Sequence, residues 1–459
     1  MAFNSLLFLF GFLPLALTLD ALVRGARLEP RLTLLVLLSF AFYGWWDLRL
    51  LPLLVFSVAI NWFAGVVLVR TRSRFIVPLA IGLDLLLLAL FKYLNFFADL
   101  LALVPGYTAP HFTIALPLGI SFFTFQHIMY LVDLRAGRAE AMGLLEYALY
   151  VAFFPRVIAG PLVRPSEFRA QLDELRRPAL EPAEWMARGF MLLTLGLAKK
   201  VMLGDPLGAF VNPIYAAVEG GAAPTVAEAW QATLGYTFQL YFDFSGYTDM
   251  AVGIALLFGI VLPENFNAPY RGCSIQDFWR RWHITLSRFL RDYLYIPMGG
   301  SRNGLGRQFL ALLATMTLGG LWHGAGLTFV AWGVVHGLAL GTDLLWRKSG
   351  RSMPTFLGVA FTFSFVALAW VLFRAPSFGT ALSIYKALFG FAPFGAFSSS
   401  FWPLLALAAV LAVVGPTARE IAERFPPARW IGMAATLVFV AVLLRIGDDT
   451  NTAFIYAQF

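Results

Sequence analysis

Long apolar runs separated by short polar loops extend along the whole chain. The runs occupy residues 4–21, 32–46, 51–69, 76–101, 113–134, 142–160, 188–204, 229–261, 308–321, 326–346, 355–373, 401–416 and 430–446. About 20 apolar residues suffice for a helix to cross the ~30 Å hydrocarbon core of a bilayer. The strands of a membrane barrel would instead alternate between apolar and polar positions. The pattern therefore predicts an all-α polytopic membrane protein with roughly 10–12 transmembrane helices.

Basic residues in the loops predict the orientation of the chain, because cytoplasmic loops carry an excess of Lys and Arg. The loop at 105–111 has no Lys or Arg and is expected outside. The first apolar run has no basic residues before it, which is typical of an uncleaved first helix with its N-terminus outside. The loops assigned to the cytoplasm contain Arg24, Arg27 and Arg31; Arg70, Arg72 and Arg74; Arg135 and Arg138; residues 271–307; Arg347, Lys348 and Arg351; and Arg419, Arg424 and Arg429.

The segment FFPRVIAGPLVRPSEF at 153–168 does not fit a simple crossing. It contains prolines and glycines, and it carries arginine on both sides. Broken backbone at membrane depth is tolerated only where it is buried in protein or lines a water-filled cavity. The segment therefore predicts a re-entrant stretch.

Composition supports the membrane assignment and excludes several functions. Of the 459 residues 59% are hydrophobic and 13% are charged, against about 25% charged in soluble proteins. The net charge of +8 arises from arginines dispersed in short loops, so we expect no nucleic-acid partner. Cys273 is the only cysteine, which excludes an intrachain disulfide and a cysteine-based metal cluster. As an isolated small residue it is expected to be buried rather than to carry an acyl group.

Standard catalytic motifs are missing from the sequence. No two histidines have HExxH or HxxxH spacing, so no metal site is expected. Neither a GxSxG elbow nor a Walker A motif is present, so a serine hydrolase or an ATPase has no motif to support it.

His323 is the sharpest candidate for chemistry. It lies in TMTLGGLWHGAGLTFVAWGVVHG, where Gly319, Gly320, Gly324 and Gly326 surround it. Glycines at these positions predict a helix break at which a substrate can approach the backbone closely. An ionisable side chain inside a membrane span is expensive and points to function, although a histidine hydrogen-bonded to a neighbouring helix is the alternative. A neutral imidazole can take a proton from a hydroxyl near pH 7, which suits acyl transfer to an alcohol.

The other four histidines have simpler explanations. His336 is expected to pack beside Trp332, although it could share a cavity with His323. His283 lies in FWRRWHITLSRFLRDYLYIPMGG at 278–300, which from residue types alone predicts an amphipathic helix at the interface with arginines toward anionic lipid. His127 and His111 are expected to be structural or exposed.

Two carboxylates, Asp243 and Asp249, lie six residues apart in QLYFDFSGYTDMAVG. They could orient a histidine, bind a cation or cap a broken helix. Gly246 between them favours a break in that helix.

Several stretches together resemble the membrane-bound O-acyltransferases, and within that family the bacterial branch that includes the membrane subunit of alginate O-acetylation. The matching stretches are LPLGISFFTFQ (116–126), AGPLVRPSEF (159–168), LYFDFSGYTDMAVG (240–253), NFNAPYRGCSIQDFWRRWHITLSRFLRDYLYIPMGG (265–300), LGGLWHGAGLTFVAWGVVHG (318–337) and the terminal FIYAQF (454–459). The chain departs from the branch at Ala457, where a second phenylalanine or a similar apolar residue is usual, and at Cys273, where a serine or another small residue is expected.

The resemblance implies a fold, a site and a reaction. It implies one domain at 1–459 that forms a ring of helices around a central tunnel, with N-terminal helices at 1–112, a core at 113–347 and C-terminal helices at 348–459. The family's catalytic histidine matches His323, and its second motif histidine matches His283 at the donor entrance. Arg280 and Arg281 are candidates to bind the phosphates of the donor, together with Arg288 and Arg291 in the same stretch, although anionic lipid explains these charges nearly as well.

The reaction implied is transfer of an acetyl group from acetyl-CoA, or a similar cytoplasmic donor used as co-substrate, to a hydroxyl of a secreted or cell-envelope polysaccharide. Expected partners are membrane lipid and a periplasmic esterase-like protein, in a bacterial inner membrane with both termini periplasmic. Within the family the alternatives are peptidoglycan acetylation and D-alanylation of teichoic acid. A polytopic transporter is a further alternative, but it would favour inverted repeats, and none is evident. A purely structural scaffold would leave the glycine-lined His323 unexplained.

Overall fold

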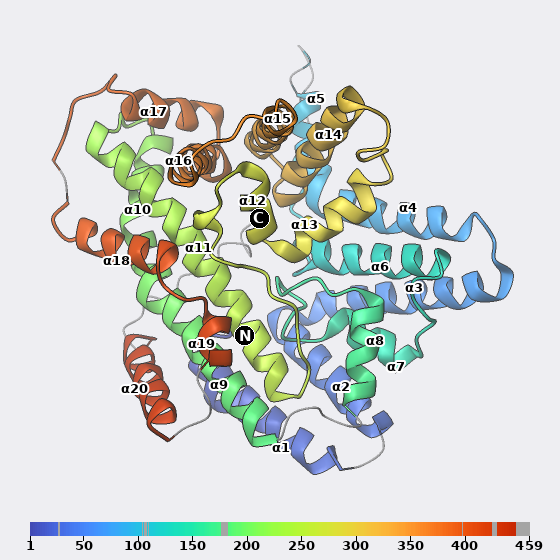
Figure 1. Ribbon diagram of the computed structural model, residues 1–459. Helices are drawn as coiled ribbons and strands as arrows, with labels where there is room; N and C mark the ends of the chain where they lie inside the picture. The colour runs from blue at the N-terminus through green and yellow to red at the C-terminus, as the bar shows by residue number, and fades with distance from the viewer. Residues whose placement is uncertain are drawn as a thin grey trace. The chain divides into compact units, whose positions relative to one another are not determined.

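The computed structural model describes residues 1–25, 28–102, 104, 108, 110–175, 182–396, 398–424 and 429–446. Every regular element in these ranges is helical, so the predicted all-α class is confirmed (Figure 1). The chain divides into two compact units. Unit 1 comprises Met1–Thr194, Thr248–Pro263 and Pro427–Ala435, and unit 2 comprises Leu195–Tyr247, Glu264–Pro426 and Thr436–Phe459. The predicted division at residues 112 and 347 stays a prediction.

Unit 1 is built mainly from the N-terminal helices. Most of the apolar helices begin and end within a few residues of the predicted runs, but α6 begins only at Ile120 and α7 already ends at Ala152. The π-helical turns η1 and η3 directly precede α1 and α5. The elements are η1 (Leu7–Phe12), α1 (Leu13–Val23), α2 (Leu28–Trp46), η2 (Leu48–Leu50), α3 (Leu51–Thr71), α4 (Ile76–Leu88), η3 (Ala89–Tyr93), α5 (Leu94–Leu101), α6 (Ile120–Arg135), α7 (Leu144–Ala152), α8 (Pro165–Glu174) and the first part of α9 (Pro182–Ala198).

Unit 2 contains the stretches that carry the candidate chemistry. Helix α11 (Val226–Leu257) starts in this unit and continues into unit 1. The other elements are η4 (Lys199–Gly204), α10 (Asp205–Glu219), η5 (Pro269–Arg271), α12 (Ile275–Arg281), α13 (Ile284–Leu290), η6 (Arg291–Tyr295), α14 (Leu305–His323), α15 (Leu327–Lys348), α16 (Thr355–Arg374), α17 (Phe378–Leu388), α18 (Phe401–Val413), α19 (Ala418–Arg424) and α20 (Arg429–Ile446), whose last part belongs here.

Several helices are long and apolar enough to cross a bilayer, as expected for a multi-pass membrane protein. Among the described residues these are Leu48–Thr71, Ile76–Leu101, Ala183–Glu219, Leu327–Lys348 and Thr355–Arg374. The pair formed by α18 and α19 is bent by 59° and adds a sixth if it counts as one span. Shorter apolar helices lie at Leu7–Val23 and Trp430–Ile446. The higher helix count, the ring and the tunnel stay predictions.

The segment after α7 has the broken backbone that the sequence predicts. Helix α7 ends at Ala152, and consecutive turns follow as far as residue 159. A Cβ at Gly160 would overlap Arg156, and one at Gly119 would overlap the Val157 carbonyl, so both glycines permit tight coiling. The Arg156 side chain is fully buried beside the rings of Tyr150 and Phe168, at 4.9 and 5.0 Å from their centroids. Whether this segment is re-entrant stays a prediction.

In unit 2, α14 and α15 pack side by side through glycines (Figure 1). A Cβ at Gly333 would lie 3.0 Å from the Cα of Thr317 and would overlap the Met316 carbonyl oxygen. A Cβ at Gly337 would lie 2.8 Å from the Cα of Leu313. Because glycine has no side chain, the two backbones approach more closely than other residues would allow.

Two expectations from the sequence are wrong. Helix α11 runs through Gly246 without a break, because the glycine instead allows close contact with the Gly196 carbonyl and Lys199. Cys273 is exposed rather than buried. It lies in the turn before α12, where its N–H and thiol face the Asp277 carboxylate at the surface. The terminal FIYAQF, with Ala457, and most of the loop at 105–111 lie outside the described residues.

Candidate active site

His323 is the last residue of α14, and the backbone becomes extended at Gly324 before α15 begins. The predicted break is therefore confirmed at Gly324 and Gly326, whereas Gly319 and Gly320 lie inside α14. The side chain is 4% exposed and lies among aromatic rings. Its centroid is 4.8 Å from that of Trp322, 5.3 Å from Trp332 and 5.3 Å from Phe373. These rings fix the position of the imidazole and exclude water around it.

His283 occupies the junction between α12 and α13. The predicted single interfacial helix is wrong here, because the chain breaks at Trp282 and restarts at Ile284, with His283 in the left-handed region at φ 44°. A non-glycine residue in this region is uncommon and indicates a position held by its surroundings. The imidazole is fully buried, and Phe244 packs edge-on at 4.8 Å between centroids.

Asn265 fixes the tautomer of His283. The Asn265 Oδ1 accepts hydrogen bonds from the backbone N–H and the hydroxyl of Thr285, at 3.2 and 3.0 Å. An amide oxygen only accepts, so His283 Nδ1, 3.0 Å away, donates to it and carries the ring proton. The lone pair of the neutral ring is therefore on Nε2. Helices α12 and α13, which flank His283, are not among the helices long and apolar enough to cross a bilayer. Burial of the imidazole lowers the pKa of His283 to about 3.

The structure brings the two motif histidines together. Their ring centroids are 6.5 Å apart, and Trp322 lies beside both, 6.4 Å from His283. Forty residues separate them in the sequence, so the hairpin of α14 and α15 and the turn at Trp282 place them in one region. Two imidazoles in a largely apolar enclosure are suited to moving a proton between a hydroxyl and a leaving group.

His336 packs behind this pair, as the sequence predicts. It is fully buried on α15, 4.7 Å from Trp332 between ring centroids. The indole N–H of Trp279 donates to His336 Nδ1 at 3.3 Å. Since Trp332 also contacts His323, one tryptophan separates the two histidines, and they do not form a joint pair.

A cavity of about 500 Å³ is lined by α12, α13, η6, α14 and α15, and neither His283 nor His323 is among its lining residues. Arginines from two separate parts of the chain surround it, and apolar side chains form its inner wall. Ile284, next to His283, and Met316, two turns before His323, belong to that wall. The lining residues are Gln276, Trp279, Arg280, Ile284, Ser287, Arg288, Leu290, Arg291, Tyr295, Gln308, Leu312, Thr315, Met316, Leu340, Leu344 and Arg347.

The adjacent arginines 280 and 281 differ in position. Arg280 lines the cavity, is exposed, and has no ion pair among the described residues. Arg281 does not line it, and its guanidinium pairs with Asp277 at 3.0 Å. Arg347 and Asn265 are site residues that the sequence pattern does not mark as such. The basic cluster at the end of α15 was the only signal for Arg347, and nothing local marks Asn265.

The carboxylate Asp243 belongs to a buried ion cluster in unit 2. Lys200 Nζ lies 2.6 Å from Asp243 and 2.9 Å from Asp205. One cation between two carboxylates explains why these charges are retained in an apolar region. Asp249 lies about one and two-thirds turns further along α11, on another face. Of the roles suggested for these carboxylates, capping a broken helix is wrong, because α11 is continuous.

The remaining histidines are structural or exposed, as predicted. His127 is fully buried in unit 1, with Nε2 2.8 Å from the Ser57 hydroxyl and Nδ1 2.6 Å from that of Tyr147. His111 has a 69% exposed side chain and lies 3.1 Å from Asp99. Within the described ranges no group of three or more His, Cys, Asp or Glu side chains is arranged to hold a metal ion.

The buried histidine pair lies within a stretch that matches a known family. Residues 88–384 match the membrane-bound O-acyltransferase (MBOAT) family. The chain belongs to the membrane-bound O-acyltransferases. It is therefore a multi-pass membrane protein and an acyltransferase, and both of the motif histidines fall inside the matched region.

Curated relatives of this acyltransferase act on different acceptors. It is 40% identical over 425 residues to the peptidoglycan O-acetyltransferase of Helicobacter pylori, covering 84% of this chain and 80% of that protein. It is also 40% identical over 403 residues to the probable alginate O-acetylase AlgI of Pseudomonas aeruginosa, covering 85% and 75%. The teichoic acid D-alanyltransferase of Bacillus subtilis is 28% identical over 286 residues, covering 59% and 71%.

Proposed function

We propose that this acyltransferase moves an acetyl group from a cytoplasmic thioester donor to a hydroxyl of a secreted or cell-envelope polysaccharide. The observation that carries the proposal is the meeting of His323 and His283 beside an arginine-lined cavity in unit 2. The wider setting proposed is a bacterial inner membrane with both termini periplasmic, and a periplasmic esterase-like partner that delivers the acetyl group to the polymer.

In this proposal the hydroxyl that first receives the acetyl group, before the partner passes the group to the polymer, attacks the thioester carbonyl carbon, and His323 takes the hydroxyl proton as general base. The carbon–sulfur bond breaks, and the proton passes to the departing thiolate. His283 orients the donor through its Nε2 face, since Nδ1 is occupied by Asn265. General-base assistance of this kind contributes roughly 10²–10⁴-fold to the rate.

The cavity suits a donor with a charged head and a flexible arm. Acetyl-CoA, used as a co-substrate, has this composition. The phosphates would lie against the four arginines of the cavity, Arg280, Arg288, Arg291 and Arg347. Each guanidinium group can donate two parallel hydrogen bonds to the oxygens of one phosphate. The apolar inner wall, which includes Ile284 and Met316, would hold the arm and direct the thioester toward the histidines.

Substitution of His323 tests the assignment. His323→Ala, inserted at wild-type level, is expected to abolish polymer acetylation in cells, measured by mass spectrometry of envelope and secreted polysaccharides. His111→Ala is the matched control, because His111 is exposed and lies in unit 1. Full acetylation with His323→Ala would refute the role of this histidine.

The acceptor requires a separate experiment. The relatives in H. pylori and P. aeruginosa are equally similar, so peptidoglycan competes with an alginate-like polymer. A deletion strain and its complemented parent should be compared for O-acetyl groups on both polymers. Loss from the exopolysaccharide supports our proposal, and loss from peptidoglycan alone would replace it. D-alanine loss from teichoic acid would indicate the third acceptor class.

A further inference from the structure

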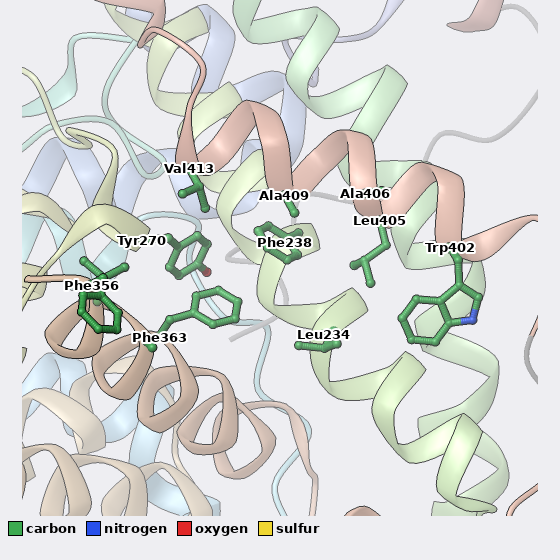
Figure 2. A pocket seen from close by; sticks show the side chains of 12 residues that line it. Leu234, Phe238, Tyr270, Phe356, Phe363, Trp402, Leu405, Ala406, Ala409 and Val413 are labelled. Atoms are coloured by element: carbon green, nitrogen blue, oxygen red, sulfur yellow. The ribbon is translucent and has the colours of Figure 1, made fainter.

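Unit 2 contains an apolar groove that the proposed reaction does not use. It has a volume of about 460 Å³ and lies between α11, α16 and α18. Figure 2 shows the rings of Phe238, Tyr270 and Phe363 lying beneath α18. These three rings are 5.4–5.8 Å apart between centroids and form a continuous surface.

The groove has a buried floor and an exposed rim. Phe238 and Tyr270 are 3% and 2% exposed, whereas Phe356 on the rim is 72% exposed. The Tyr270 hydroxyl donates to the Thr237 carbonyl at 2.6 Å, so its polar end is occupied by the protein. A surface of this kind favours a hydrocarbon chain.

The length of the groove matches one leaflet of a bilayer. Along α18 it extends from Trp402 to Val413, and eleven residues of α-helix rise about 16 Å. Half of the ~30 Å hydrocarbon core is about 15 Å. One acyl chain lying along the groove would therefore place its headgroup near Val413.

A charged pocket of about 660 Å³ begins where the groove ends. Val413 and Tyr270 line the groove, and the next residues, Val414 and Arg271, line the pocket. Arg271 donates to the carbonyls of Val413 and Gly415, which are exposed where α18 stops. The pocket is also lined by Arg424, Glu420 and Glu423, so it presents two cationic and two anionic side chains. One oxygen of Glu420 accepts from the Thr417 N–H at 2.8 Å, and one oxygen of Glu423 pairs with Arg419 at 2.7 Å. Each carboxylate has a second oxygen that can accept a hydrogen bond from a ligand.

We infer that groove and pocket together bind one molecule of phosphatidylethanolamine, with an acyl chain along α18 and the headgroup at Arg271, Arg424, Glu420 and Glu423. The arginines face the phosphate, and the carboxylates accept hydrogen bonds from the ammonium group. Phosphatidylglycerol has no cation for the glutamates. Phosphatidylcholine has no N–H to donate to them.

The groove is connected to the proposed site through one ring contact and one helix. Tyr270 in the groove floor is 6.2 Å from Trp282, the neighbour of His283, between ring centroids. Phe363 lies on α16, the helix that also places Phe373 against His323. A bound lipid therefore supports the wall of the site.

The experiment is native mass spectrometry of the full chain in detergent, titrated with palmitoyl-oleoyl phosphatidylethanolamine, phosphatidylglycerol or phosphatidylcholine. We expect a one-to-one adduct with phosphatidylethanolamine, with a Kd roughly tenfold lower than for the other two lipids, equivalent to about 1.4 kcal/mol. Ala409→Trp fills the groove and should weaken this adduct roughly tenfold. The matched control is Leu407→Trp, on a face of α18 that does not line the groove.

A second pair of variants tests the headgroup and guards against misfolding. Ala406→Phe, at the exposed rim of the groove, should also weaken the adduct. It replaces Ala409→Trp as the test of the groove if that variant does not fold. Glu423→Gln should reduce the preference for phosphatidylethanolamine over phosphatidylglycerol. Equal binding of all three lipids would overturn the headgroup assignment. An adduct that persists in both groove variants, or the absence of an adduct in the wild type, would overturn the lipid site. This outcome is independent of the proposed function, which is tested by loss of polymer acetylation in His323→Ala.

Discussion

Adding one methyl group at Gly333 should lower both stability and activity, although Gly333 does not contact substrate. The added Cβ would lie 3.0 Å from the Cα of Thr317, against an optimal carbon–carbon separation of about 3.5–4.0 Å. It would also overlap the Met316 carbonyl oxygen. Helices α14 and α15 would therefore have to separate by roughly 0.5–1 Å.

The cost follows from two opposing effects. Overpacking of this size costs about 1–3 kcal/mol, and the replacement of glycine by alanine inside a helix returns up to about 1 kcal/mol. Trp332, next to Gly333, contacts His323, so the shift displaces the wall of the site. Since a 1 Å misplacement can cost about 10²-fold in rate, we expect turnover to fall at least roughly tenfold.

The assay is thermal unfolding in nanodiscs together with acetyl transfer by reconstituted protein. Gly82→Ala is the matched control, because Gly82 is also inside a helix but has no atom within 4 Å of its added Cβ. It should be neutral or slightly stabilising and fully active. If Gly333→Ala behaved like Gly82→Ala in both assays, the close packing of α14 against α15 would not position His323.

Three further outcomes follow from single side chains. Arg280→Gln should raise the KM for acetyl-CoA roughly fivefold, about 1 kcal/mol for one lost charge contact, whereas Arg281→Gln should change it less, because only Arg280 lines the cavity. The free energy of unfolding should fall as the pH drops from about 6.5 toward 3, by up to about 1.4 kcal/mol per pH unit through His283, because in this range His283 is protonated in the unfolded chain but stays neutral in the folded protein. The free energy of unfolding of His283→Asn should depend less steeply on pH across this range. An unchanged pH dependence would contradict this prediction. Arg156→Met should leave the melting temperature unchanged or raise it, because the buried guanidinium has no hydrogen-bond partner among the described residues; a large fall would indicate a bound anion.

The sequence predicted the features that depend on local pattern. Most apolar runs longer than about 15 residues form helices, because hydrophobicity over that length decides the environment. The run at 142–160 is helical only as far as Ala152, where prolines and glycines follow. Helix α14 ends at His323, as the glycines that follow it predict, because Gly324 and Gly326 lie at the junction between α14 and α15. Gly246 gives the same local signal but lies inside the continuous helix α11. There the Gly196 carbonyl and Lys199 pack into the space that a side chain at position 246 would fill.

The sequence did not predict features that depend on contacts distant in the chain. Asn265 fixes the tautomer of His283 from eighteen residues away, and the left-handed backbone at His283 is set by its buried surroundings. Arg280 and Arg281 are equivalent in composition, and only the pairing of Arg281 with Asp277 separates them. Cys273 was expected inside because cysteines are often buried, but its turn lies at the surface.

The composition of unit 1 has a consequence for how the protein is made. Two of its three parts, Thr248–Pro263 and Pro427–Ala435, follow long stretches that belong to unit 2. The ribosome synthesises the chain from the N-terminus, so the first 194 residues enter the membrane well before the rest of their own unit exists. Unit 1 becomes complete only when nearly all of the polypeptide has been inserted, and a nonsense mutation before residue 427 would damage both units.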